Sequence, residues 1–237
     1  MSNTYFRFKQ FTVHQQACAM KVCTDACLFA AWLADELEKM KVENILDIGS
    51  GTGLLSLMIA QKNPANIHAV EIDKEAAKQA TENFSASPWS DRLKVFHGSI
   101  QDYQPAAQYD FICSNPPFFE NDLKSSNEQR NTALHSSDLS SGELIASIKR
   151  LLRPTGHFAL LLPYHRSAIV EQLAIRQGFY LHKKISVQQT EKHVFFRSML
   201  MFGSGEKALV EKTMIIREKG EYSADFTLLL TDYYLYL

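Results

Sequence analysis

The run Ser-Asn-Pro-Pro-Phe at residues 114–118 places two acceptors, a rigid backbone and an aromatic ring at the end of an apolar stretch. Asn115 offers a side-chain oxygen and Pro116 a backbone carbonyl, while Pro117 holds both rigid because proline fixes φ. Two acceptors that hold the hydrogens of one amino group favour a pyramidal nitrogen and direct its lone pair. Phe118 can stack on a planar group, a contact worth about 1–3 kcal/mol per base. The run therefore predicts chemistry at an amino group whose lone pair is delocalised.

A second motif, Asp47-Ile-Gly-Ser-Gly-Thr-Gly53, follows an apolar run and precedes a long apolar segment. Its glycines let the backbone bend sharply and approach a ligand closely. Glu71 lies near the end of the next apolar run, and its carboxylate could accept hydrogen bonds from both hydroxyls of a ribose. We expect Asp102, after the third apolar run, to meet an adenine amino group. The predicted cofactor-binding residues in these motifs are Asp47, Gly49, Gly51, Gly53, Glu71, Ile72, Asp102 and Asn115.

The glycine spacing bears on the identity of this cofactor. A dinucleotide places its pyrophosphate at a helix N-terminus and is typically held by G-x-G-x-x-G. Here the third glycine comes one residue earlier and the motif begins with Asp47. Together with the diproline motif, this pattern favours S-adenosylmethionine over a nicotinamide cofactor.

The motifs fall within an alternation of strands and helices. The segments expected to form strands are 44–48, 67–72, 93–97, 109–114, 157–162, 180–187 and 194–202, with helices near 25–39, 54–60, 74–84, 142–152 and 166–177. Such alternation predicts right-handed crossovers and an α/β, Rossmann-like, mainly parallel seven-stranded sheet with helices on both faces. A short loop joins the last two strands, which predicts an antiparallel edge strand. The fourth strand should lie beside the first, with both motifs at their carboxyl ends, where such sheets bind ligands.

We divide the chain into three parts. Residues 1–43 form an N-terminal arm and helix, residues 44–205 the core, and residues 206–237 a C-terminal extension packed on that core. Within the core, the polar segment 119–141 is a candidate substrate loop.

The charge distribution and composition limit the possible partners. Residues 35–140 hold nine Lys or Arg against sixteen acidic residues, whereas both flanking segments are mildly basic. Basic ends are compatible with a polyanionic partner. No apolar stretch approaches the roughly 20 residues of a membrane span, and the N-terminus lacks a secretory pattern, so a cytoplasmic protein without a membrane partner is expected. Cys18, Cys23, Cys27 and Cys113 lack metal-ligand spacing, which predicts free thiols and no metal.

The motifs D-I-G-S-G-T-G, V-E-I-D and S-N-P-P-F together resemble the class I methyltransferases that modify planar nitrogen. Further segments resemble one family, the bacterial tRNA N6-adenine methyltransferases that modify the adenosine beside the anticodon of a valine tRNA. These segments are Phe8–Phe11, Ala19–Val22 with Thr24-Asp25, Ser87–Arg92 and Tyr222–Phe226, and the likeness runs from about Phe6 to the C-terminus. It implies S-adenosylmethionine as the methyl donor, adenosine N6 in tRNA as the acceptor, and Lys21 and Thr24 at the cofactor site. No obligatory protein partner is evident.

The chain departs from the family pattern at four positions. Cys23 and Ala26 stand where the family commonly has glycine, which should be tolerated if both residues adopt ordinary backbone dihedrals. Phe118 stands where tyrosine is frequent, which suits adenine because adenine needs only stacking. Leu134 replaces a frequent arginine in the 119–141 segment.

Alternative functions remain at this point. Protein glutamine N5-methyltransferases share the N-P-P core but carry a longer domain before the glycine turn. A guanine-N2 rRNA methyltransferase would bring a second domain, a DNA adenine methyltransferase a target-recognition domain, and an oxidoreductase would leave Asn115 to Phe118 unused. A non-catalytic RNA-binding module would not need Glu71. Candidate phosphate contacts are Arg7, Lys9, Lys21, Lys183, Lys184, Lys192 and Arg197.

Overall fold

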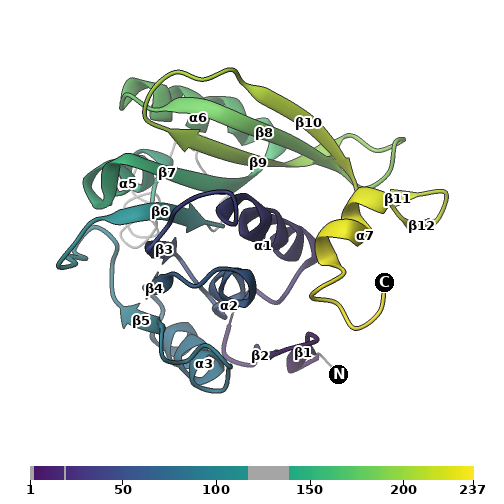
Figure 1. Ribbon diagram of the computed structural model, residues 1–237, viewed down its shortest axis with the longest axis horizontal. Helices are drawn as coiled ribbons and strands as arrows, with labels where there is room; N and C mark the ends of the chain where they lie inside the picture. The colour runs from purple at the N-terminus through teal and green to yellow at the C-terminus, as the bar shows by residue number, and fades with distance from the viewer. Residues whose placement is uncertain (1–2, 19, 117–138) are drawn as a thin grey trace, which may run out of the picture.

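The computed structural model describes residues 3–18, 20–116 and 139–237 and is built on one large sheet (Figure 1). Within these described residues, the sheet has eight strands in the order β10-β8-β9-β7-β6-β3-β4-β5. These are β3 (Asn44–Ile48), β4 (Asn66–Glu71), β5 (Leu93–His97), β6 (Tyr109–Ser114), β7 (Leu152–Pro163), β8 (Tyr180–Gln188), β9 (Phe195–Gly203) and β10 (Val210–Ile215). The mainly parallel α/β sheet predicted from the sequence is confirmed.

Two details of the predicted sheet are wrong. The part of the chain that the structure describes contributes eight strands instead of seven, because β10 pairs in parallel with β8 and forms the edge of the sheet. The antiparallel strand β9 therefore lies inside the sheet, between β7 and β8. An edge strand buries little of its surface, and within β10 only Met214 is fully buried. Its sequence consequently lacks the apolar run by which the other strands are recognised.

Helices cover both faces of the sheet (Figure 1). They are α1 (Thr24–Leu37), α2 (Leu54–Lys62), α3 (Lys74–Ser85), α5 (Ser141–Leu151), α6 (Ser167–Arg176) and α7 (Ala224–Leu230). Alternate residues of a strand point to opposite faces, so Ile45 packs with α1 and α2 whereas its neighbour Leu46 packs with α5. Helix α2 is buried along almost its whole length, which explains its uniformly apolar sequence.

The N-terminal arm is a hairpin of β1 (Tyr5–Arg7) and β2 (Thr12–His14). Its strand β2 is joined to α3 by Asn83, whose side chain exchanges two hydrogen bonds of 2.9 Å with the backbone of His14. The same Asn83 amide donates to the carbonyl of Thr52 at 2.9 Å, within the glycine turn. The arm is thus fixed directly to the turn that follows β3.

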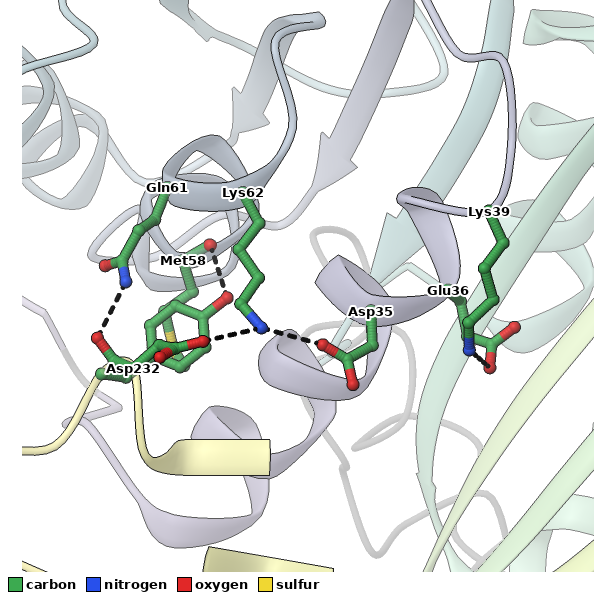
Figure 2. Close-up of polar contacts among 8 residues, drawn as sticks. Asp35, Glu36, Lys39, Met58, Gln61, Lys62 and Asp232 are labelled. Atoms are coloured by element: carbon green, nitrogen blue, oxygen red, sulfur yellow. Dashed lines mark hydrogen bonds and ion pairs between the residues drawn. The ribbon is translucent and has the colours of Figure 1, made fainter. Parts of the chain in front are cut away.

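Helix α7 follows the short strands β11 (Arg217–Glu218) and β12 (Glu221–Tyr222) and packs on α1, and the residues after it are fixed to α2. Figure 2 shows the ammonium of Lys62 between the carboxylates of Asp35 and Asp232, at 3.0 Å from each. Gln61 donates to the carbonyl of Asp232 at 2.8 Å, and the Tyr233 hydroxyl donates to that of Met58 at 3.1 Å. Because the Lys9 amide also donates to the Tyr233 carbonyl, both ends of the chain meet on this face.

Among the residues that the structure describes, none of the helices combines the length and the apolar character that crossing a bilayer requires.

Candidate active site

The predicted motifs meet at the carboxyl edge of the sheet. Chain order runs from β3 to β4 and β5 on one side, and β6 then returns to the other side of β3. This reversal is the position at which open parallel sheets bind ligands. Ile48 at the end of β3 pairs with Ser114 of β6 and with Val70 of β4. The glycine turn, Glu71 and Asn115 therefore follow neighbouring strand ends.

The three glycines of the turn serve different purposes. All have positive φ, at +72° for Gly49, +52° for Gly51 and +79° for Gly53, where other residues are strained. A Cβ on Gly53 would lie 2.5 Å from the Phe84 ring, so this glycine is also required for helix packing. A Cβ on Gly49 or Gly51 would meet nothing within 4 Å. These two glycines therefore leave open space at the turn, where a ligand can approach the backbone.

Glu71 ties the glycine turn to the end of β4. Its two carboxylate oxygens accept hydrogen bonds from the amides of Gly51 at 2.8 Å and Asp73 at 2.9 Å. Each oxygen retains a lone pair, so the carboxylate can also accept from two ligand hydroxyls. The next side chain, Ile72, is 54% exposed and adds an apolar surface beside this acceptor.

Asp47 is completely buried beneath the turn. Its Oδ2 atom accepts a hydrogen bond of 2.8 Å from the Ser56 hydroxyl, whereas Oδ1 has no partner among the described residues. Burial is the main cause that raises the pKa of this carboxyl to about 7. A buried acceptor without a donor destabilises a protein, so Oδ1 marks a place where a cationic or hydrogen-bonding ligand group would be stabilised.

We expect Asp47 to make the stability of the ligand-free protein fall as pH rises from about 4 to about 7. In that range the folded protein retains a proton that the unfolded chain has lost, because its folded-state pKa is the higher one. In Asp47→Asn this pH-dependent contribution disappears. Between pH 4 and pH 7 the free energy of unfolding of the variant should therefore rise relative to that of the wild type by up to roughly 4 kcal/mol. Urea unfolding of both proteins at pH 4 and pH 8 measures this gain. If the difference in unfolding free energy between the two proteins does not change with pH, the raised pKa of Asp47 is contradicted.

Asn115 follows β6 and is positioned from two sides. The preceding Ser114 hydroxyl donates to the carbonyl of Ile48 at 2.7 Å, which joins the ends of β6 and β3. The Asn115 amide nitrogen contacts the sulfur of Met20 at 3.8 Å, while its oxygen is buried without a partner in the described part of the chain. A thioether accepts but does not donate hydrogen bonds. Met20 therefore orients the amide with its nitrogen toward the arm and leaves the oxygen available.

Pro116 is partly buried and directly follows Asn115. Pro117, Phe118, Leu134 and most of the 119–141 segment lie outside the described residues. Their predicted roles in the site remain predictions.

The other predicted cofactor residues, Lys21, Thr24 and Asp102, have exposed side chains. The segment that carries Lys21 is held by the buried Gln15, whose side-chain oxygen accepts from the Val22 amide at 2.8 Å. Arg150 of α5 holds the loop of Asp102 through hydrogen bonds to the carbonyls of Ile100, Gln101 and Tyr103, at 2.8, 3.2 and 2.7 Å. The predictions omitted Met20, Gln15 and Arg150, and no local pattern in the sequence marks them as partners of the site.

The two lost glycines are accommodated as expected. Cys23 precedes α1 in an extended conformation, at φ −130° and ψ 156°, and Ala26 lies in the helix. The expected free thiols are also found: Cys18, Cys27 and Cys113 are buried, and Cys23 is partly buried. Burial, followed by the charges of Glu71 and Asp73, raises the pKa of Cys18 to about 11. Within the described ranges, no group of three His, Cys, Asp or Glu side chains could hold a metal ion.

Several of the basic side chains considered for phosphate contacts bind within the protein instead. Lys183 pairs with Glu36, which also accepts from Lys39 at 3.1 Å, and Arg197 pairs with Asp25 at 2.7 Å. The ammonium of Lys184 lies 4.0 Å from Glu211, and that of Lys9 donates to the Thr231 carbonyl at 2.5 Å. Arg7, Lys21 and Lys192 are exposed.

Comparison with known proteins agrees with this geometry. The model of the methyltransferase small domain family matches residues 27–179. A class I S-adenosylmethionine-dependent methyltransferase from Listeria monocytogenes, described as putative, has the same fold, with a TM-score of 0.60 at 15% identity over 84% of this chain and 67% of that one. A protein from Agrobacterium tumefaciens, described as a predicted O-methyltransferase, gives a TM-score of 0.65 at 17% identity over 88% and 96% of the two chains.

The fold and the family model define a class I methyltransferase. A curated relative from Dyadobacter fermentans is 44% identical over 239 residues, covers 98% of both chains, and is named tRNA1(Val) (adenine(37)-N6)-methyltransferase. Other curated relatives, at 36% to 42% identity, carry the same name. The chain belongs to this family of tRNA adenine-N6-methyltransferases.

Proposed function

We propose that this protein transfers a methyl group from S-adenosylmethionine to N6 of adenosine 37 in a valine tRNA. The observation that carries the proposal is the unpartnered, buried amide oxygen of Asn115, which lies beside the turn of Gly49 and Gly51. Membership of a family whose curated members are named for this reaction supports the choice of substrate. A tRNA substrate is also consistent with a cytoplasmic protein.

The residues at the edge of the sheet suit S-adenosylmethionine. Glu71 would accept from the ribose hydroxyls, and the apolar side chain of Ile72 would lie against the adenine, with Asp102 near its amino group. The ammonium group of the ligand would donate to Oδ1 of Asp47, which has no hydrogen-bond partner among the described residues. Lys21 and Thr24 remain proposed contacts on the arm side. When bound, the cofactor supplies an electrophilic methyl group on a sulfonium.

The protein's contribution to the reaction is to position the acceptor nitrogen. The Asn115 oxygen and the Pro116 carbonyl each accept one N–H of the adenine amino group, which favours a pyramidal nitrogen with its lone pair directed toward the methyl group. Pro117 keeps the acceptors rigid, and Phe118 stacks on the base. Transfer of the methyl group from the sulfonium would leave positive charge on N6, which both acceptors would stabilise. The proton then leaves to solvent, so no strong base is required.

The division of the chain follows from these roles. We propose that residues 44–205 form the catalytic core, with residues 119–141 as its substrate loop. Residues 1–43 then complete the site through Met20, and residues 206–237 add the edge strand β10 to the sheet and pack on α1 and α2.

Methylation of defined RNA tests the proposal. Purified protein is incubated with S-adenosylmethionine and a valine tRNA transcript, and with the same transcript carrying guanosine at position 37. Mass spectrometry of the nucleosides should show N6-methyladenosine in the first RNA and none in the second. Methylation that does not depend on adenosine 37, or that appears on guanine N2 or on a protein glutamine instead, would reject the assignment.

A further inference from the structure

An aromatic surface lies beside Asn115 at the carboxyl edge of the sheet. Ser114 of β6 pairs with Leu160 of β7, and β7 continues for three more residues to Pro163. At roughly 3.3 Å per residue, β7 extends about 10 Å beyond the end of β6. Its neighbour β9 begins at the same level, since Pro163 pairs with Arg197. The carboxyl end of β7 and the start of β9 therefore border one side of the proposed site for the substrate adenine.

Two aromatic rings lie where β7 ends and β9 begins. Tyr164, the residue after β7, is 38% exposed, and its ring packs on Phe195 of β9 with centroids 5.0 Å apart. The backbone of Tyr164 is held in a 3-10 turn, where its carbonyl accepts from the Ser167 hydroxyl at 2.7 Å. Arg197 fixes the start of β9 to the start of α1 through its ion pair with Asp25. The pair of rings is thus held in place while part of its surface faces solvent.

The surroundings of the rings are basic. His165 and Arg166 follow Tyr164, and Lys192 and His193 precede Phe195 in the loop between β8 and β9. That loop is ordered by Thr190, whose hydroxyl lies 2.7 Å from the His193 ring and accepts from the Lys192 amide at 3.3 Å. Glu191 is the single acidic residue in the segments 164–166 and 190–197. Aromatic faces bordered by cations, with one acidic residue among them, favour single-stranded nucleic acid.

We propose that this surface, comprising Tyr164, His165, Arg166, Lys192, His193 and Phe195, binds the anticodon-loop nucleotides next to the methylated adenosine. The inference rests on the proposed function. An adenine that enters the site has to leave the base stack, which exposes the face of its neighbour in the RNA. Tyr164 follows β7, the strand that pairs with β6 next to Asn115, and Phe195 packs on it, so both rings lie on the side of the site toward which that neighbour would extend. The basic side chains then lie beside its phosphates.

Two substitutions with matched controls test this surface. Tyr164→Ala and Phe195→Ala should weaken binding of an anticodon stem-loop RNA about tenfold, the size of one lost stacking contact. They should also raise KM for tRNA without changing the affinity for S-adenosylmethionine. Tyr164→Phe keeps the ring and should bind like the wild type. Tyr180→Ala removes a tyrosine that is 43% exposed at the start of β8, at the amino ends of the parallel strands. This variant should also bind like the wild type.

Fluorescence anisotropy of the labelled stem-loop gives the RNA affinity, and isothermal titration calorimetry gives the cofactor affinity. The proposal is overturned if both alanine variants bind the RNA as Tyr180→Ala does while the wild type methylates tRNA. If the wild type methylates no tRNA, the proposed function fails instead, so the two failures are distinguishable. Equal losses in Tyr164→Ala and Tyr164→Phe would also reject stacking as the cause.

Discussion

Asn115→Ala is expected to lower the rate of methyl transfer by at least about 10²–10³-fold while the affinity for S-adenosylmethionine stays near that of the wild type. The Asn115 oxygen is buried and unpartnered, and the amide is already oriented by Met20 and by the strand end at Ser114. It therefore needs no reorganisation when charge develops on the adenine nitrogen. Removing one preorganised hydrogen-bond donor from an oxyanion hole typically reduces kcat by this factor, and we expect a similar loss for a preorganised acceptor.

The measurement is kcat under saturating tRNA, with the cofactor affinity from calorimetry. Asn66→Ala provides the matched control, because Asn66 is an exposed asparagine at the amino end of β4, at the opposite edge of the sheet. It should leave both quantities unchanged. Normal turnover in Asn115→Ala would show that the amide oxygen does not hold the substrate, whatever the substrate is.

Glu71→Ala is expected to weaken the binding of S-adenosylmethionine by about 100-fold or more. The substitution removes the proposed acceptor of two ribose hydroxyls, and hydrogen bonds to charged groups contribute about 1.5–3 kcal/mol each. It also leaves the amides of Gly51 and Asp73 without their partner, which loosens the turn itself. We therefore expect the free energy of unfolding to fall as well, by about 1–3 kcal/mol.

Calorimetry and urea unfolding separate these two effects. Glu71→Gln keeps an acceptor for one amide but directs an NH₂ group at the other, so its affinity should be intermediate. Glu75→Ala, which removes an exposed carboxylate from the first turn of α3, should match the wild type in both measurements. An unchanged cofactor affinity in Glu71→Ala would remove this residue from the cofactor site.

The sequence alone determined the features that depend on neighbouring residues. Alternating apolar segments predicted the parallel α/β sheet, and the positive φ of Gly49, Gly51 and Gly53 agrees with the sharp turn that their spacing indicates. The position of the fourth predicted strand beside the first was also correct, whereas the order at the β10 end of the sheet was not. The roles assigned to Asn115 and Glu71 remain predictions, although the structure places both at the same sheet edge. The edge strand β10 was missed because a strand that buries little surface carries little apolar pattern.

Only the tertiary structure decided the contacts between distant segments. Met20 and Asn115 are 95 residues apart, and no pattern along the chain indicates that a thioether orients the amide. Nor could the sequence show that Oδ1 of Asp47 lacks a partner, or that Lys183 and Arg197 are held by Glu36 and Asp25. Local preferences act over a few residues, through backbone dihedrals and the periodicity of burial. Pairing and desolvation of polar groups depend on which surfaces meet when the whole chain packs.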